Sequence, residues 1–167
     1  ADDWPLYIDD HDASNNLLSL RGNGALTAPK TPAFCVKASS ATDTNANSST
    51  HTVAWGTEIF DQGSNFASNT FTAPVTGKYQ LNLSLAMTDI DTGASYIRVD
   101  VVTSNNTYIN IIVDPNYSAD LSYLGGQLTV LADMDASDTA TVGINVGGGD
   151  SVTNITNNSV FSGFLAC

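Results

Sequence analysis

The clearest strand signal in the chain is the segment Phe71-Thr-Ala-Pro-Val-Thr-Gly-Lys-Tyr79-Gln-Leu-Asn-Leu-Ser-Leu-Ala86. Its start predicts a short strand, which Pro74 ends because proline has no backbone N–H to donate to a ladder. Gly77 then supplies a turn. Apolar and polar residues alternate from Tyr79 to Leu85. This period of two predicts a long strand with one buried face and one solvated face.

Similar extended segments recur through the rest of the chain. Further strands are expected over residues 33–38, 53–60, 96–102, 108–113, 121–132, 139–146 and 160–167. Trp55 and Ile59 are the expected apolar anchors of the second of these, and Gly125-Gly126 permits a bulge or a close backbone approach. About nine or ten short strands without a helical period predict an all-β sandwich or barrel.

The charge balance narrows the range of partners. The 167 residues include 5 basic and 17 acidic side chains, which gives a net charge of -12. No Lys/Arg cluster is present, so nucleic acid is not expected as a partner, because binding phosphates requires cations. An acidic surface disfavours anionic membranes. No apolar run approaches the roughly 20 residues of a membrane span.

Residues 1–32 differ from the rest of the chain. They are acidic early, rich in turn residues, and contain two short strand-like pieces at 17–21 and 24–27. These pieces are too small to bury a core alone, so they are expected to pack on the following domain or to wind round identical copies. Pro29 and Pro32 mark the join. We therefore predict a connector over residues 1–32 and a globular domain over residues 33–167.

The segment from Phe71 to Tyr79 resembles the globular head domain of the complement C1q family, part of the C1q/tumour-necrosis-factor superfamily. The family pattern there is an aromatic, a small pair, Pro, two residues, Gly, one residue and Tyr. Other segments agree in order and spacing, namely Pro32-Ala-Phe34, Ile59 to Phe66, and the closing Ser159-Val-Phe-Ser-Gly-Phe-Leu165. The resemblance covers about residues 32–167. It implies a ten-stranded jelly-roll β-sandwich that assembles as a homotrimer.

Two departures from the complement proteins refine this resemblance. The chain has no collagen Gly-X-Y stalk, and its lead-in from Leu17 to Phe34 resembles the segments that join bacteriophage fibre heads to their shafts. The low Lys/Arg count leaves no basic patch of the kind that some complement heads use. The resemblance therefore implies a phage-type head on the virion surface, with a fibre shaft upstream. A secreted C1q-like lectin is an alternative.

Such a head would bind a host-surface receptor, either glycan or protein, without catalysis. Aromatic rings stack on sugars and anchor protein contacts. The predicted ligand contacts are Tyr117, Asn116, Asp120 and Trp55. Tyr96 and Tyr108 are expected at the trimer interface instead. A purely structural domain, serving trimerisation or capsid decoration without a ligand, is the second hypothesis.

Two acidic turns are candidate sites for a hard cation such as Ca²⁺, because alternating carboxylates can present oxygens to one ion. One is the D-x-D-x-x-D turn of Asp133, Asp135 and Asp138. The other is D-x-D-x-G at Asp89 and Asp91. Neither is a complete EF-hand loop, since the spacing after the glycine fails and no ligating Glu follows. The alternative is a solvated turn, where Asp is common.

The chain carries no recognisable catalytic motif. It lacks G-x-S-x-G, a Cys–His pairing and H-E-x-x-H. His11 and His51 lie in polar segments, and a general base needs a partner that holds it in place. We predict that the protein is not an enzyme.

The two cysteines are far apart in sequence. Cys35 falls in the first strand of the predicted domain and Cys167 at the end of the last. The resemblance implies that these strands are antiparallel neighbours, which makes a disulfide possible. Two free thiols, as is normal for a protein assembled in a bacterial cytosol, are the alternative.

Overall fold

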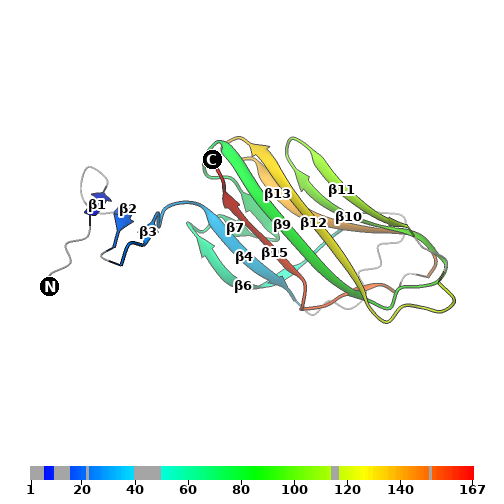
Figure 1. The fold of residues 1–167 in the computed structure, drawn as a ribbon. Helices are drawn as coiled ribbons and strands as arrows, with labels where there is room; N and C mark the ends of the chain where they lie inside the picture. The colour runs from blue at the N-terminus through cyan, green and yellow to red at the C-terminus, as the bar shows by residue number, and fades with distance from the viewer. Residues whose placement is uncertain (1–5, 10–15, 22, 40–49, 114–116, 151) are drawn as a thin grey trace.

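The computed structural model describes residues 6–9, 16–21, 23–39, 50–113, 117–150 and 152–167 (Figure 1). Within these ranges the chain forms 15 strands and no helix. The all-β prediction is therefore confirmed. It also follows that the described residues contain no helix able to cross a membrane.

Two antiparallel sheets face each other and enclose the core (Figure 1). One, named here the β10 sheet, has the order β11 (Thr107–Val113), β10 (Ala94–Thr103), β13 (Thr139–Gly148), β8 (Thr70–Thr72) and β7 (Phe66–Ala67). The other, the β9 sheet, has the order β12 (Leu124–Met134), β9 (Gly77–Thr88), β15 (Val160–Leu165), β4 (Ala33–Ala38) and β6 (Trp55–Gln62). These ten strands match the predicted jelly-roll sandwich. Two short strands, β5 (His51–Thr52) and β14 (Asn154–Ile155), pair with β13 and β9 in addition.

Alternation along β9 divides its side chains between core and surface. The odd-numbered residues Tyr79, Leu81, Leu83, Leu85 and Met87 are all buried. The Tyr79 hydroxyl donates to the Val75 carbonyl at 2.8 Å, so its polar atom has a partner within the core. The segment from Phe71 to Tyr79 thus folds back on itself after Pro74. Its predicted role as the start of the main core strand is confirmed.

An aromatic cluster joins the first and last strands of the sandwich. Phe34 of β4 lies 4.6 Å from Phe71 and 5.0 Å from Phe161, measured between ring centroids. β15 pairs antiparallel with both β4 and β9, with Gly163 opposite Phe34 and Leu81. A Cβ at Gly163 would lie 2.8 Å from the Phe34 ring, so this position has no room for a side chain. The predicted neighbourhood of first and last strands is confirmed.

Of the two residues predicted to anchor β6 in the core, one is buried and the other is exposed. Trp55 is buried opposite Ala38 and stacks on Phe161 at 5.7 Å, whereas Ile59 is 55% exposed. The register with β4 skips a residue, since Cys35 pairs with Phe60 and the next pairing uses Glu58. This irregularity leaves Ile59 unpaired and shifts the alternation. The anchor role of Ile59 was wrong for that reason.

Gly125-Gly126 would permit a bulge, but none forms there. Pairing between β12 and β9 runs without interruption from Leu124 opposite Met87 to Met134 opposite Gly77. Both glycines therefore occupy ordinary ladder positions in a regular strand.

The N-terminal segment forms a separate three-stranded sheet of β1 (Leu6–Asp9), β2 (Asn16–Leu20) and β3 (Leu26–Thr27). Figure 1 shows it to one side of the sandwich. Ile8, Leu20 and Leu26 are 50%, 44% and 64% exposed, so the sheet buries little of its own apolar surface. The Gln62 side chain donates to the carbonyls of Ala28 and Thr31, which fastens the join to the sandwich.

Candidate functional site

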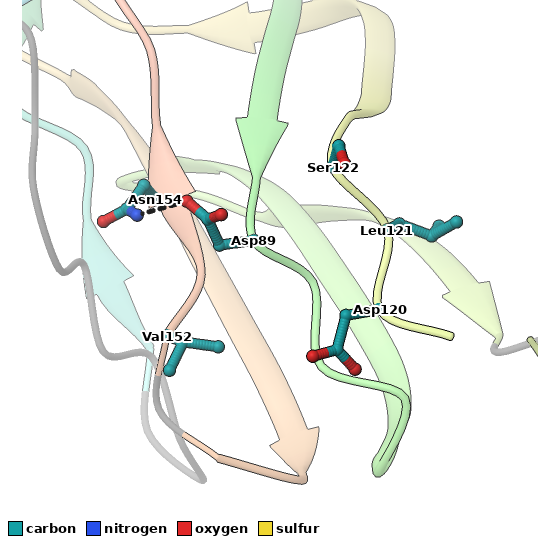
Figure 2. Close-up of a pocket in the computed structure, with 6 residues that line it drawn as sticks. All are labelled: Asp89, Asp120, Leu121, Ser122, Val152 and Asn154. Atoms are coloured by element: carbon teal, nitrogen blue, oxygen red, sulfur yellow. Dashed lines mark hydrogen bonds between the residues drawn. The ribbon is translucent and has the colours of Figure 1, made fainter. Parts of the chain in front are cut away.

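A polar pocket of about 400 Å³ opens at the end of the sandwich away from β1–β3, here called the distal end (Figures 1 and 2). It lies between the loop after β9, the segment before β12 and the segment that leads into β14. Its lining residues are Asp89, Asp120, Leu121, Ser122, Val152 and Asn154. The volume falls within the range of about 300–1,000 Å³ that is typical of small-ligand sites.

A small bridge holds two of these segments together. The N–H of Ile90 donates to the Leu121 carbonyl at 2.9 Å, and the N–H of Leu121 donates to the Ile90 carbonyl at 2.9 Å. Ile90 is only 3% exposed, so it anchors the loop in the core. Asp89, one residue earlier, has φ of 59°, a left-handed conformation that Asp and Asn adopt more readily than most residues. The bridge therefore fixes Asp89 and Asp120 on neighbouring segments.

Each of the two pocket carboxylates uses one oxygen inside the protein. Asp89 Oδ2 accepts from Asn154 Nδ2 at 2.8 Å and from the Thr88 hydroxyl at 3.0 Å (Figure 2). Asp120 Oδ1 accepts from the Thr92 N–H at 3.0 Å. Asp89 Oδ1 and Asp120 Oδ2 have no partner among the described residues. Each carboxylate is thus positioned by one oxygen and offers the other as an acceptor.

Glycines let a third loop approach closely. Gly149 has φ of 68°, and a Cβ there would lie 2.8 Å from both the Ala94 nitrogen and the Asp91 carboxylate. A Cβ on Gly93 would in turn lie 3.0 Å from Gly149 Cα. The loop after β13 therefore packs backbone to backbone on the loop before β10. This contact steadies the base of the distal loops.

Negative charge at the pocket has no basic counterpart. Asp91 lies on the same loop as Asp89, Asp150 lies on the loop that carries Val152, and none of the pocket-lining residues is Lys or Arg. The chain has only five such cations, Arg21, Lys30, Lys37, Lys78 and Arg98. Two of these are committed elsewhere, since Lys78 pairs with Asp133 and Arg98 with Asp100. The pocket therefore combines two carboxylates, an amide and a hydroxyl with the aliphatic walls of Leu121 and Val152.

The predicted ligand residues divide between several places. Asp120 lines the pocket, and Tyr117, three residues before it, is half-buried and outside the lining. Asn116 lies outside the described residues. Trp55 was wrong as a ligand contact, because it is 9% exposed and stacked in the core. Trp55 pairs with Ala38 and faces the core, so its ring is not available to a ligand at the surface.

Sequence reasoning missed five pocket residues as ligand contacts: Asp89, Leu121, Ser122, Val152 and Asn154. Asp89 stood out only as part of an acidic turn. Ser122 and Asn154 carry no local signal, because loops rich in Ser and Asn are common throughout this chain. An exposed aromatic, Tyr123 at 78%, follows Ser122 directly.

The other acidic turn does not assemble a metal site. Asp133 pairs with Lys78 at 2.6 Å, and Asp135 Oδ1 accepts from the Thr76 hydroxyl at 3.4 Å. Asp138 Oδ2 accepts from Asn105 Nδ2 at 2.6 Å and from the Asp135 N–H at 2.8 Å. No group of three or more His, Cys, Asp or Glu side chains with metal-binding geometry occurs in the described part of the chain. The predicted Ca²⁺ site at Asp133, Asp135 and Asp138 is corrected to a turn whose carboxylates hold protein groups.

The two cysteines are free thiols. β4 and β15 are neighbours as predicted, but their register places Cys35 opposite Ser162, five residues before Cys167. An extended chain advances about 3.3 Å per residue, so the cysteines lie on the order of 15 Å apart, beyond the roughly 7 Å that a disulfide spans. The disulfide between them is therefore not formed. Burial raises the pKa of the Cys35 thiol.

The tyrosines expected at an interface lie on the β10 sheet. Tyr96 covers Gly147, where a Cβ would meet its ring at 2.1 Å, and its hydroxyl donates to Asn145 Oδ1 at 3.1 Å. Tyr108 is half-buried and packs against the core. Both therefore already have structural partners within the chain. Their place in a trimer interface stays a prediction.

Large apolar side chains are exposed on two other surfaces. On the outward side of the β9 sheet, Phe60, Leu131 and Phe164 are 49%, 56% and 45% exposed. On the edge strand β11, Ile109 and Ile111 are 46% and 56% exposed. We name these the β9-sheet face and the β11 edge. Exposed apolar patches of this kind mark contact surfaces more often than single scattered residues do.

Comparison with known proteins identifies the fold. No family model matches the chain, and no curated protein is similar to it in sequence. Among solved structures it is similar to the globular domain of the zebrafish complement 1qA protein, with a TM-score of 0.58 and 17% sequence identity. The alignment covers 82% of this chain and 98% of that one. The fold is C1q-like. A shared fold does not carry a function with it, because functions reside in sites on the fold.

Proposed function

We propose that this chain is the non-enzymatic, homotrimeric head of a viral fibre or spike of the bacteriophage type, which binds a host-surface glycan. The observation that carries the proposal is the polar pocket at the distal end, on the loops farthest from the N-terminal segment (Figure 1). A sandwich presents such loops while its sheets stay rigid. Polar acceptors beside aliphatic walls suit a sugar, which has hydroxyl groups on its rim and C–H groups on its ring faces.

The two apolar surfaces support a trimer. A ring of identical subunits needs two unlike, complementary surfaces on each copy, and the β9-sheet face and the β11 edge are two such surfaces. The sheet neighbours of Phe164 and Leu131 are uncharged, with Gln80 between them. On a chain of net charge -12, burying an uncharged face avoids bringing carboxylates together. Packing the β11 edge of one copy on the β9-sheet face of the next removes both from water.

The N-terminal segment suits a connector to a shaft. Its sheet of β1–β3 leaves Ile8, Leu20 and Leu26 exposed and is too small to be stable alone. The same segment from two other copies would cover these side chains around a common axis. This arrangement accounts for a small, partly apolar sheet placed before a folded head, and it agrees with the resemblance of residues 17–34 to phage connectors.

The affinity of such a head comes from the number of binding sites that it carries. A shallow pocket gives weak binding, but three pockets held on one rigid head bind a repeated surface ligand by avidity, gaining about 10²–10⁴ over a single site. The virion surface is the corresponding location. A secreted C1q-like lectin is the alternative that the likeness to the zebrafish complement domain favours, and it uses the same pocket.

A purely structural clamp is the second candidate, favoured by the apolar β9-sheet face, which assembly alone would require. The receptor-binding head and the structural clamp differ in whether the pocket binds a glycan. Binding of the intact protein to a glycan panel, abolished by free sugar, is expected for the receptor-binding head. Absence of any saturable binding by a proven trimer would leave the clamp.

Assembly is tested first, by light scattering on the intact chain. The expected mass is three times the 17.5 kDa of one chain. Phe164→Asp should give monomers, while Tyr123→Asp, also on an exposed side chain but outside both surfaces, should remain trimeric. Cys35 lies on the same face as Phe60, so its reaction with a thiol reagent should speed up in the Phe164→Asp monomer. A wild-type monomer would contradict the proposal.

A further inference from the structure

We infer that the distal pocket selects sugars that present hydrogen-bond donors and carry no acidic group. This inference rests on the proposed function, in which the pocket binds a glycan, and it adds the chemical class of that glycan. It follows from three features of the pocket: each of its two carboxylates has an oxygen without a partner among the described residues, none of its lining residues is basic, and its remaining lining includes aliphatic and uncharged polar side chains.

The free oxygens of the pocket can only accept. An ionised carboxylate has no hydrogen to donate, and Asp89 and Asp120 each keep one oxygen without a partner among the described residues. A ligand must therefore bring donors to both. Sugar hydroxyls do so, and the ammonium group of an amino sugar does so with a positive charge. Hydrogen bonds to an ionised acceptor are roughly twice as strong as neutral ones.

Acidic sugars lack a partner at this site. A sialic acid, a uronic acid or a phosphorylated sugar is normally held by Arg or Lys, which bind carboxylate and phosphate. None of the residues that line the pocket is basic, and Asp91 and Asp150 add negative charge on the same loops. Like charges brought together at an interface oppose binding and suppress wrong partners. The pocket is therefore built to reject anionic glycans.

The remaining lining fits an uncharged ring. Val152 offers aliphatic surface to the C–H face of a sugar, Leu121 backs the pocket from its place against the core, and Ser122 and the Asn154 amide add polar groups to the lining. The acceptors are already in place, because Asn154 holds Asp89 and the Thr92 N–H holds Asp120. A site arranged before the ligand arrives loses less conformational entropy on binding.

The test is a glycan array probed with the intact oligomer, with neutral, ammonium-bearing and acidic glycans displayed at equal density. Binding is expected to neutral glycans, ammonium-bearing glycans or both, and acidic glycans are expected to bind at least tenfold more weakly. Raising NaCl from 0.05 to 0.5 M separates the two donor types, since the ammonium contact weakens with salt and the hydroxyl contact does not.

Variants at the pocket connect the binding to these residues. Asp120→Asn and Asp89→Asn keep an oxygen for the internal hydrogen bonds and remove the charge, so each should weaken binding about five- to twentyfold, in line with losing charge assistance. Asp133→Asn, at the opposite end, is the matched control and should bind like wild type. Circular dichroism confirms that the variants are folded.

The outcomes separate the inference from the proposed function. Preference for acidic glycans would overturn the inference and leave a glycan-binding head. Binding to non-acidic glycans that is unchanged in both Asp→Asn variants would place the glycan elsewhere and overturn the inference as well. No binding to any glycan by an intact trimer would overturn the glycan-binding function itself, and the inference with it.

Discussion

The two ends of the sandwich use the same residue type in opposite ways. At the end that carries the 133–138 turn, Asp133, Asp135 and Asp138 bind a lysine, a threonine, an asparagine and a backbone N–H. At the distal end, Asp89 and Asp120 each bind protein through one oxygen and leave the other open to the pocket. Both ends contain a D-x-D pattern, so the pattern alone does not separate carboxylates that hold protein groups from carboxylates that are open to a pocket.

The difference lies in what the folded chain brings alongside. Lys78 stands opposite Asp133 in the β9–β12 register, and the turn at Asn105 reaches Asp138 from the other sheet. Among the described residues, nothing comparable reaches the free oxygens of Asp89 and Asp120. Engaged carboxylates should therefore matter for stability, and the open ones for binding. The following substitutions test that division, beginning with a carboxylate that is buried entirely.

Arg98→Met should have the largest effect on stability. Asp100 has no exposed surface, and Arg98 Nε and Nη2 donate to it at 2.6–2.9 Å. Hydrogen bonds to Asp100 raise the pKa of Arg98, so the guanidinium stays charged and the pair persists at every ordinary pH. Removing one partner of a buried pair costs about 3–5 kcal/mol. Urea denaturation measures the loss.

A double variant is the control for that prediction. Arg98→Met with Asp100→Leu replaces the whole pair by apolar groups and should recover most of the stability. If Arg98→Met alone lowers the free energy of unfolding by less than about 1 kcal/mol, water reaches Asp100, and the carboxylate is less dependent on its partner than the structure indicates.

Asp138→Ala should come next, with a loss of about 1–3 kcal/mol, because Asn105 Nδ2 and the Asp135 N–H both lose their acceptor. Asp138→Asn keeps one oxygen and should lose less. Thermal unfolding of the three proteins gives the comparison. Glycan binding should be the same in all of them, and a parallel fall in binding would contradict the separation of the two ends.

Substitutions of Asp89 and Asp120 should affect stability little and binding strongly, the reverse of the effect expected for Asp138. Asp120→Asn and Asp89→Asn should change the free energy of unfolding by no more than about 0.5 kcal/mol, the usual range for surface substitutions, while both are expected to weaken glycan binding. Asp89→Ala is the informative contrast, because alanine tolerates the φ of 59° poorly and should cost about 1–3 kcal/mol. Equal stability losses for Asn and Ala at position 89 would mean that the charge, and not the backbone, is what the fold requires.

Asp133→Asn should have the smallest effect. The pair with Lys78 is short, at 2.6 Å, but the two side chains are 46% and 74% exposed. Exposed pairs contribute about 0–1 kcal/mol, and 1 M salt should remove the difference from wild type. A loss that persists in high salt would indicate that Asp133 does more than pair with one lysine.

Local patterns sufficed for most of the fold. The alternation in Tyr79–Leu85 predicted the core strand correctly. Phe71 and Phe161, two aromatics of the predicted strands, both pack against Phe34 in the core. The exposure of Ile59 was not predicted, because a shift in the pairing of β6 with β4 changes the alternation, and no residue near Ile59 signals that shift. The residues of the pocket were harder to predict from the sequence than the strands were. Asp120 was found from its loop, but Asp89, Val152 and Asn154 come from segments that only the folded chain places around it.

The sequence alone determined the all-β class and the main strands, because period-two alternation and turn residues act over short distances along the chain. The C1q-like fold was expected only from the resemblance of a few spaced segments to that family. Only the tertiary structure decided which aspartates are engaged, where Trp55 lies and why Cys35 and Cys167 remain apart. Each of these depends on strand register. A pairing shifted by one residue moves a side chain to the other face of a sheet, and no local pattern records which pairing the chain adopts.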